Sequence, residues 1–254
     1  AYADLDTSVI KELPPGRFPI NTVIISNQKR REVIDRIRAA CIGGNQVYWV
    51  CTLIEESETL ECQAAEATAQ NLVKQLPDIK IGLIHGRMKS EEKNKIMADF
   101  KKGTIQLLVA TTVIEVGVDV PNASLMIVEN AERLGLAQLH QLRGRIGRGN
   151  NKSHCILLYQ APLSRNSKLR LSVLRDSSDG FYIAEKDLEL RGPGQVLGTK
   201  QAGLMTFKVA DLRRDAQLLD DVKVSSEIIF QNHLEHIDPL IQRWLSHKEE
   251  YVNV

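Results

Sequence analysis

Paired cysteines are missing from this sequence. Its four cysteines are too widely spaced for any C-x-x-C motif, so neither a zinc cluster nor a disulfide framework is predicted and a reducing cytosol fits the chain (Cys41, Cys51, Cys62 and Cys155). Long hydrophobic runs are missing too, since stretches such as residues 105–114 are far shorter than the ~20 residues of a membrane span. The chain opens without a basic leader region or an initiator Met, so we expect it to be a segment of a longer protein.

Net charge is almost absent as well. The 33 Lys and Arg residues and the 32 Asp and Glu residues leave a charge of +1, so a surface that binds nucleic acid would have to be a local patch. With 254 residues, 43% hydrophobic and 26% charged, the composition is that of a globular protein of one or two domains.

Short apolar runs alternate with amphipathic helical segments between residues 20 and 162. The strands are expected at residues 22–26, 46–51, 80–84, 105–110, 125–128 and 155–159, and the first helices at residues 29–41, 60–76 and from Ser90 to Gly103. Strands rich in Val, Ile and Leu with helices between them predict a parallel sheet that is covered on both faces. We therefore expect one three-layer α/β domain over residues 20–162.

The pattern changes on either side of this domain. Residues 1–19 contain Pro14-Pro15-Gly16, which prevents a regular element and indicates a linker that leads into the domain. Residues 163–254 are mostly helical in pattern and predict a helical C-terminal extension, with helices expected at residues 168–175, 181–190, 210–230 and 239–247.

Charge is unevenly distributed along the chain. Residues 133–175 contain no acidic residue, although the average acid content would supply about five, and they contain nine basic ones (Arg133, Arg143, Arg145, Arg148, Lys152, Arg165, Lys168, Arg170 and Arg175). A solvated basic face is the ordinary interpretation of such a run. Arginines outnumber lysines here, however, and the planar guanidinium suits phosphate oxygens, which favours a phosphate-binding surface.

The run Q-L-R-G-R-I-G-R-G at residues 141–149 is the most specific part of this window. Arg145 and Arg148 are three residues apart, so on a helical turn both guanidiniums could point to the same side. Such a pair could neutralise the charge that develops on a transferred γ-phosphoryl group. The structural alternative is a helix C-terminus whose last carbonyls are satisfied by these arginines.

Four segments resemble motifs of superfamily-two helicases. Residues 141–149 resemble motif VI, residues 110–121 (A-T-T-V-I-E-V-G-V-D-V-P) resemble motif V, and residues 47–58 (V-Y-W-V-C-T-L-I-E-E-S-E) resemble motif IV. Residues 83–88 (L-I-H-G-R-M) resemble the strand-to-helix turn that touches the DNA backbone in these enzymes. Their order and spacing are similar to those of the second RecA-like motor domain, which implies a P-loop-NTPase-type fold over residues 20–162.

The C-terminal part narrows the resemblance. Residues 179–194 and 198–203 are similar to the translocation motif that the RecG family shares with the transcription-repair coupling translocases. Residues 1–10 and 13–17 are similar to the RecG family and not to the coupling factor. The chain therefore resembles the C-terminal part of the bacterial RecG helicases, which remodel stalled replication forks and Holliday junctions. A coupling translocase, or a non-catalytic binding module of the same fold, remain the alternatives.

The resemblance implies a role for each of several residues. Arg145 and Arg148 would face the γ-phosphate of ATP with Gln141 nearby, and Gly117 and Asp119 would lie at the nucleotide. DNA phosphates would be contacted by His85, Gly86, Thr111 and Thr112. Arg170, Arg191 and Gln201 match the translocation motif and would couple closure of the cleft to DNA movement, whereas their structural alternative is salt bridges within the helical extension.

A phosphate-binding loop is absent from these 254 residues. No G-x-x-x-x-G-K-[ST] motif and no D-E-x-H-type box for Mg²⁺ occurs, and no residue is predicted as a metal ligand. In the family these motifs lie on the first motor domain, which we expect to precede Ala1 and to hold ATP and Mg²⁺. We therefore expect no ATP hydrolysis by this polypeptide alone. Its expected partners are branched or duplex DNA and the N-terminal wedge and first motor domain of the same protein, in the bacterial cytoplasm at the nucleoid and not at a membrane.

Overall fold

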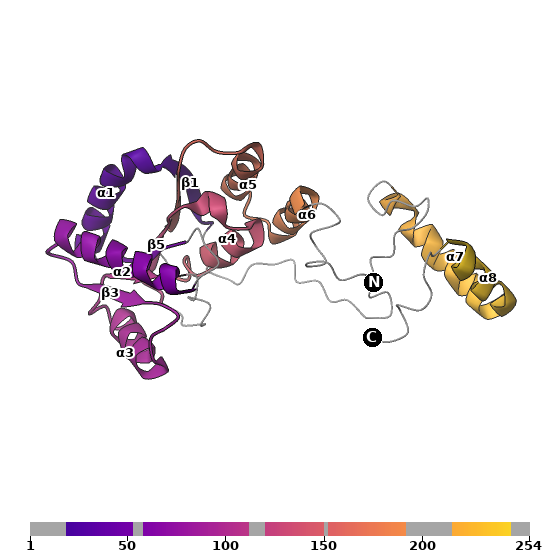
Figure 1. Ribbon diagram of the computed structural model, residues 1–254, viewed down its shortest axis with the longest axis horizontal. Coiled ribbons are helices and arrows are strands. Elements are labelled where there is room, and N and C mark those ends of the chain that lie inside the picture. Colours follow the sequence, from indigo (N-terminus) through magenta and orange to yellow (C-terminus); the bar gives the residue numbers. More distant parts are fainter. Residues whose placement is uncertain (1–18, 53–57, 112–119, 150–151, 192–214, 245–254) are drawn as a thin grey trace. The chain divides into compact units, whose positions relative to one another are not determined.

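The computed structural model describes residues 19–52, 58–111, 120–149, 152–191 and 215–244. The chain divides into two compact units, residues 1–190 and residues 191–254, which are described separately below. Figure 1 shows the first unit from indigo to orange and the helices of the second unit in yellow.

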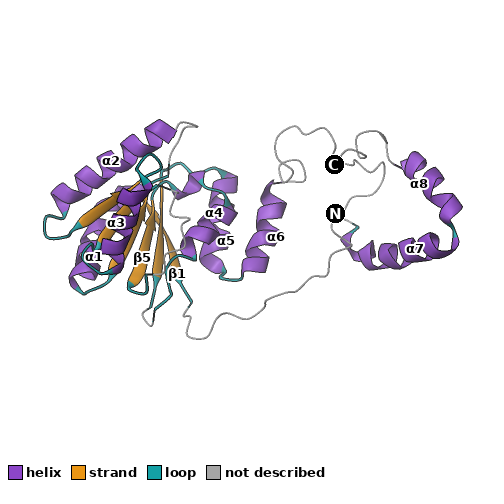
Figure 2. Cartoon of the chain, turned by 90° about the horizontal axis from the view of Figure 1, so that it is seen from below, coloured by secondary structure: helices purple, strands orange, loops and turns teal. Residues whose placement is uncertain are grey.

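The first unit is built on a six-stranded sheet in which every neighbouring pair is parallel. The strands are β1 (Asn21–Ser26), β2 (Gln46–Val50), β3 (Ile81–Ile84), β4 (Leu107–Ala110), β5 (Ala123–Val128) and β6 (His154–Tyr159). They lie in the order β1-β6-β5-β2-β4-β3, so β1 and β3 form the two edges. Figure 2 shows this sheet with helices packed around it.

Helices connect the strands and continue beyond the last one. They are α1 (Arg30–Ile42), α2 (Glu58–Gln75), α3 (Ser90–Lys101), α4 (Leu136–Arg143), α5 (Arg165–Asp176) and α6 (Gly180–Arg191), together with the 3₁₀ turns η1 (Asn27–Lys29) and η2 (Ala131–Arg133). The predicted three-layer α/β fold with a parallel sheet is confirmed. Helix α4 was not predicted as a separate element, because its eight residues are too few to show a helical period.

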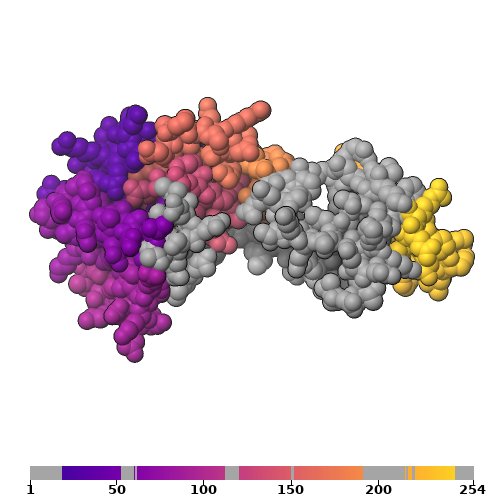
Figure 3. All heavy atoms as spheres, viewed as in Figure 1, coloured from indigo at the N-terminus to yellow at the C-terminus, as the bar shows by residue number. Residues whose placement is uncertain are grey.

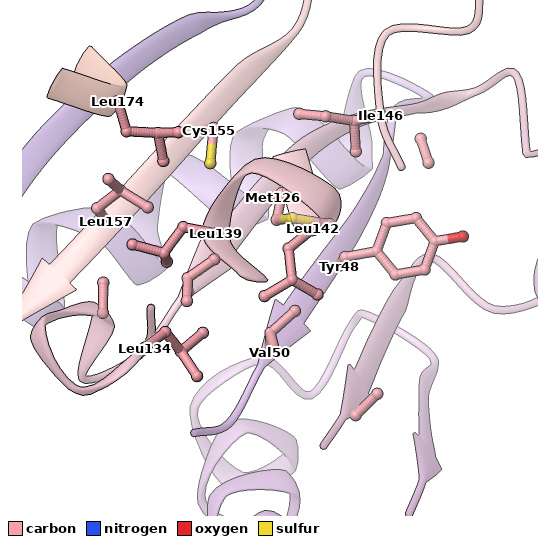
Figure 4. Packing of buried hydrophobic residues seen from close by; sticks show 14 of the residues in the cluster. Tyr48, Val50, Met126, Leu134, Leu139, Leu142, Ile146, Cys155, Leu157 and Leu174 are labelled. Carbon is pink, nitrogen blue, oxygen red and sulfur yellow. The ribbon is translucent and has the colours of Figure 1, made fainter. Parts of the chain in front are cut away.

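Alternate residues of the strands separate the core into two clusters. Tyr48 and Val50 of β2 point to the side covered by α3, α4 and α5, whereas Val47 and Trp49 point to the side covered by α1 and α2. Strands β2 and β5 are buried along their whole length, because both of their faces are covered. Figure 4 shows how Leu139 and Leu142 of α4 pack on the first of these faces.

The first two helices beyond the last strand belong to this unit. Leu171 and Leu174 of α5 and Ile183 of α6 are buried in the same cluster as the strands. The compact unit therefore extends to Leu190 and not only to Pro162, where the sequence pattern changes. Figure 3 shows the atoms of this C-terminal part of the unit, from salmon to orange, on its surface.

The second unit contains the turn η3 (Ala216–Leu218), α7 (Leu219–Asn232), the turn η4 (Leu234–His236) and α8 (Ile237–Trp244). The described part of residues 163–244 contains helices and no strand, which agrees with the predicted helical extension. Several large apolar side chains of α7 are exposed, including Val222, Ile228 and Phe230. Among the described residues, no helix has both the length and the apolar character that crossing a membrane requires.

All four cysteines are buried in the first unit and none is paired with another. Burial raises the pKa of the Cys41 thiol to about 11 and that of the Cys155 thiol to about 12. The pKa of Cys51 is also raised to about 12, first by burial and second by the nearby carboxylate of Glu129. The thiols of Cys41, Cys51 and Cys155 are therefore packing groups and remain protonated at neutral pH.

Candidate functional site

The carboxyl ends of β3 and β4 bring together three of the residues that were predicted to contact DNA, namely His85, Gly86 and Thr111. The backbone N–H of Thr111 donates to the carbonyl of Ile84 at 3.2 Å, so Thr111 lies beside the start of the turn formed by His85 and Gly86. Ligands bind at this edge in parallel sheets, because the connecting loops diverge there. Thr112 lies outside the described residues.

Two buried polar atoms at this edge have no hydrogen-bond partner among the described residues, namely Oγ1 of Thr111 and Nδ1 of His85. The other ring nitrogen of His85 lies 3.4 Å from a carboxylate oxygen of Glu66, which orients the imidazole. A cation is also present, since Nζ of Lys93 donates to the carbonyl of Gly86 at 2.7 Å. A hydroxyl, an imidazole and an ammonium group at one edge suit a phosphate oxygen.

The segment 141–149 begins on α4 and then leaves the helix. Gly144 caps α4, and the backbone N–H of Arg145 bonds to the carbonyl of Leu142 at 2.9 Å in the turn that follows. Arg145 and Arg148 therefore do not share a helical turn, which corrects the geometry expected from their spacing. Arg145 is half-buried and Arg148 is exposed, while Gln141 is exposed on the last turn of α4.

Two glycines shape this loop. Gly147 has a φ of +76°, a backbone conformation that side chains other than glycine rarely adopt. Gly149 lies so close to Pro121 that an added Cβ would be 2.3 Å from the proline carbonyl oxygen. Because Pro121 ends the segment that resembles motif V, this approach brings motifs V and VI into backbone contact. Gly117 and Asp119 of motif V lie outside the described residues.

Arg143, which belongs to the same segment, has a structural role. Its guanidinium is buried and donates to the carbonyls of Leu174 at 2.7 Å and Ser177 at 2.9 Å, at the C-terminal end of α5. The other guanidinium nitrogen lies 3.3 Å from Nδ1 of His140. The structural alternative for this motif was an arginine that satisfies the last carbonyls of a helix. Arg143 has that role, but the carbonyls belong to the neighbouring helix α5 and not to α4.

Arg170 is the one residue of the predicted coupling set whose side chain is described. It lies on α5 and donates to the carbonyl of Glu132 at 2.8 Å and to Oγ of Ser167 at 3.2 Å. Arg191 is the last residue of α6, and its side chain is outside the described residues, as is the whole of Gln201. Neither of these described contacts is a salt bridge, because one acceptor is a backbone carbonyl and the other is a serine hydroxyl.

The basic window of residues 133–175 is not one uniform surface. Arg143 is buried, and Arg175 forms two hydrogen bonds with the carboxylate of Asp176, which lies just outside the window. The exposed members include Arg148, Lys152 and Lys168. Only a subset of the nine residues is therefore accessible at the surface for the predicted phosphate binding.

Sequence patterns did not single out Glu129, which follows β5. Its carboxylate accepts hydrogen bonds from Nε of Arg30 at 3.0 Å and from Nε1 of Trp49 at 2.9 Å. The available signal was a charged residue placed directly after the apolar run at residues 125–128, at the edge of the sheet where ligands bind in parallel sheets.

One group of metal-ligand type occurs among the described residues, His233, Glu235 and His236 of the second unit. All three side chains are exposed, and each imidazole already lies within 3.6 Å of the Glu235 carboxylate. We assign no metal to it.

Comparisons with known proteins agree with this geometry. The family model of the helicase conserved C-terminal domain matches residues 28–150, and that of the C-terminal part of domain 3 of the ATP-dependent DNA helicase RecG matches residues 177–249. The chain is 61% identical over all 254 residues to ATP-dependent DNA helicase RecG of Escherichia coli K12, and covers 37% of that protein. It is 47% identical over 220 residues to RecG of Thermotoga maritima, which is 86% of this chain and 28% of the relative.

A solved structure is similar as well. The structure of RecG bound to a three-way DNA junction matches with a TM-score of 0.68 and 44% identity, over 86% of this chain and 28% of the other.

Fold and matches together define a helicase C-terminal domain with the RecA-like architecture. More narrowly, the chain belongs to the RecG family and represents its C-terminal part. It spans about 37% of the length of the E. coli relative.

Proposed function

We propose that the intact protein containing this segment is an ATP-dependent DNA helicase and translocase that remodels stalled replication forks and Holliday junctions. The observation that carries the proposal is the 61% identity to a RecG over all 254 residues, a range that spans the run at residues 141–149. A coupling translocase is disfavoured, because the family model that matches residues 177–249 is the one for RecG.

The residues present fit part of an ATP site. Two arginines on the loop after α4, Arg145 and Arg148, supply guanidiniums of the kind that stabilises a γ-phosphate during transfer. The 254 residues contain no phosphate-binding loop and no D-E-x-H-type box, so we assign the cradle for ATP and Mg²⁺ to a first motor domain of the same protein. When bound, ATP supplies the free energy of hydrolysis that drives the cycle.

This segment would contribute three things to that cycle. Arg145 and Arg148 would stabilise the transition state, with Gln141 beside them. Gly117 and Asp119 of motif V would lie at the nucleotide, and the backbone contact between Gly149 and Pro121 would keep motifs V and VI together. Arg170, Arg191 and Gln201 would transmit the change to DNA.

DNA would be held through its phosphates. His85, Gly86, Thr111 and Thr112 follow strands that end at the same edge of the sheet, and none of them would need to reach a base. Binding of this kind recognises the shape of a fork or junction and carries no sequence preference. The intact protein would act with its own wedge and first motor domain, in the cytoplasm at the nucleoid.

The proposal is tested by comparing the intact protein with the 254-residue chain. Hydrolysis of ATP and unwinding of a three-way junction are measured for both under the same conditions. The intact protein is expected to hydrolyse ATP and to unwind the junction, whereas the chain alone is expected to show no hydrolysis with or without DNA. An intact protein that binds DNA without hydrolysis would support the non-catalytic module. Turnover by the chain alone would contradict the view that it supplies only part of the ATP site.

A further inference from the structure

The five residues that follow β5 form a turn of unusual backbone geometry, here called the β5 turn (residues 129–133). Asn130 has a φ of +50° and a ψ of +44°, which places it in the left-handed helical region. It is the one residue other than glycine with a positive φ among those that the structure describes. Asn is among the residues that tolerate this conformation best, and other side chains are disfavoured there. The short turn η2 follows at once, with the N–H of Arg133 bonded to the carbonyl of Asn130.

Thr52, at the end of β2, fastens one side of the β5 turn. Its buried hydroxyl lies within hydrogen-bond distance of the carbonyls of Glu129 and Asn130, the latter at 3.1 Å. In return Nδ2 of Asn130 donates to the carbonyl of Thr52 at 3.4 Å. The N–H of Glu129 bonds to the carbonyl of Val50 at 2.9 Å, so pairing between these two chain segments continues beyond the sheet.

Helix α5 fastens the other side. The guanidinium of Arg170 donates to the carbonyl of Glu132 at 2.8 Å, and the hydroxyl of Ser167 approaches the same oxygen at 3.4 Å. The backbone N–H of Gln160 also reaches the Glu132 carboxylate at 3.3 Å. The β5 turn is therefore the hydrogen-bonded link between Arg170 and the residues at which the motif IV segment leaves β2.

This link differs in kind from ordinary surface contacts. Its main acceptors are backbone carbonyls of a turn with one defined conformation, so a shift of α5 that is carried by Arg170 would displace the backbone of the turn. The carboxylate of Glu129 holds the start of the turn to Arg30 of α1 and Trp49 of β2. A packed, hydrogen-bonded connection of this type can carry energetic coupling between two sites.

We propose that Thr52 and Asn130 are positioning residues for translocation. They hold the β5 turn in the conformation that seats Arg170, and thereby couple movement of α5 to the segment that follows β2. The inference rests on the proposed helicase function and extends it to two residues that have so far been given no role at the nucleotide, at DNA or in coupling. Thr52 lies in the segment that resembles motif IV, and Asn130 lies outside the four motif segments. Neither residue is expected to touch ATP.

The test uses the intact protein and the ratio of base pairs unwound to ATP hydrolysed on a three-way junction. Thr52→Val removes the hydroxyl at nearly constant volume, and Thr52→Ser restores it. We expect Thr52→Val to lower the ratio about three- to tenfold, with DNA-stimulated hydrolysis nearly unchanged, and Thr52→Ser to recover most of it. Asn130→Gly keeps the left-handed backbone but loses the side-chain hydrogen bond, and is expected to fall between wild type and Asn130→Ala.

A matched control is available at the opposite end of β5. The buried hydroxyl of Ser124 donates to Oδ1 of Asn45 at 3.0 Å, so Ser124→Ala also deletes a buried hydrogen bond from this strand. It is expected to lower thermal stability in the same way as Thr52→Val while leaving the ratio unchanged. If Thr52→Val and Ser124→Ala gave the same ratio of base pairs unwound to ATP hydrolysed, Thr52 would have a purely structural role and the proposal would be overturned.

A double variant tests the route through Arg170. If Thr52 acts through Arg170, then Arg170→Ala combined with Thr52→Val should lower the ratio no further than Arg170→Ala alone. Independent, multiplicative losses would overturn the proposed link. A wild-type intact protein without ATP-dependent unwinding would instead refute the proposed function itself, so the two failures are distinguishable.

Discussion

Arg143 donates a 2.7 Å hydrogen bond to the backbone carbonyl of Leu174, which fixes the end of α5 to the helix that carries Gln141. Arg170, which also lies on α5, donates a hydrogen bond to the carbonyl of Glu132 in the β5 turn. Helix α5 is thus attached at two points, one from the motif VI segment and one from the turn after β5. Under the proposed function, a change at the ATP site would reach α5 through the first attachment.

Removal of the Arg143 side chain should cost much of the stability of the first unit. Arg143→Met fills a similar volume but leaves the buried carbonyl of Leu174 and the partly buried carbonyl of Ser177 without this donor, at an expected cost of about 2–4 kcal/mol. Chemical unfolding of the 254-residue chain measures this loss in the free energy of unfolding. The matched change Arg175→Met removes an exposed guanidinium that pairs with its neighbour Asp176, and should shift the midpoint very little. Similar shifts for both variants would contradict the structural role of Arg143.

In the intact protein, Arg148→Ala is expected to reduce ATP hydrolysis by about 10³ or more while leaving ATP and DNA binding largely intact. The reason is that an arginine of this kind acts mainly on charge that develops in the transition state. Steady-state hydrolysis and separate binding titrations check it, with the exposed Lys152→Ala as a control. Unchanged kcat with a lower melting temperature would show that Arg148 supports the fold instead.

Alanine at Arg170, Arg191 or Gln201 should preserve DNA-stimulated hydrolysis and impair junction unwinding. For Arg170 the physical reason is the loss of its bond to the Glu132 carbonyl, which disconnects α5 from the β5 turn without touching the nucleotide. Both rates are measured on one junction substrate. A parallel loss of hydrolysis and unwinding would place these residues in the ATP site or in the fold.

DNA binding by the 254-residue chain should be weak and steeply dependent on salt. Each phosphate contact contributes about −0.9 to the slope of log K against log salt, and Lys168→Ala should remove close to one such contact. Binding titrations over a range of KCl concentrations measure the slope, with Lys223→Ala on α7 as the control. Binding that ignores salt, or that prefers one base sequence, would contradict phosphate recognition.

Acid should destabilise the first unit partly through His140. The pKa of His140 is lowered below its usual 6.5, first by burial and second by the positive charge of Arg143. Because the unfolded chain then binds the proton more readily, stability is complete above the unfolded pKa and falls as the pH drops below it. His140→Gln should flatten this part of the pH dependence, and unfolding midpoints between about pH 5.5 and 7.5 would show it. An unchanged slope would contradict the assignment, with His154→Gln on β6 as the control.

The sheet and its flanking helices follow from local patterns, which is why they could be predicted. Strands β2 and β5 are apolar at all but one position each, and α1 repeats its apolar residues with the helical period. The predicted strand at residues 105–110 begins later, at Leu107, because the N–H of Gln106 bonds to Lys80 outside the regular ladder. Such end effects depend on neighbours that are distant in sequence.

The site was only partly predictable for the same reason. The motif predicts that Arg145 and Arg148 lie near a phosphate, but it does not show that Arg143 turns inward and bonds to Leu174 of another helix, 31 residues away. The role of Asn130 depends on a backbone conformation and on a partner at Thr52, and no periodic pattern records either. Long-range hydrogen bonds between loops are set by the assembled fold.

The burial of all four thiols has a practical consequence for following the motion of this segment. Cys41, Cys51 and Cys155 have raised pKa values, and Cys62 is buried in the same unit, so maleimide dyes and spin labels should react with them slowly at neutral pH. One cysteine introduced at exposed Asn166 on α5 would then be the dominant labelling site of this segment. A fluorophore there would report the position of α5 through the proposed ATP cycle of the intact protein, without any change to the native core.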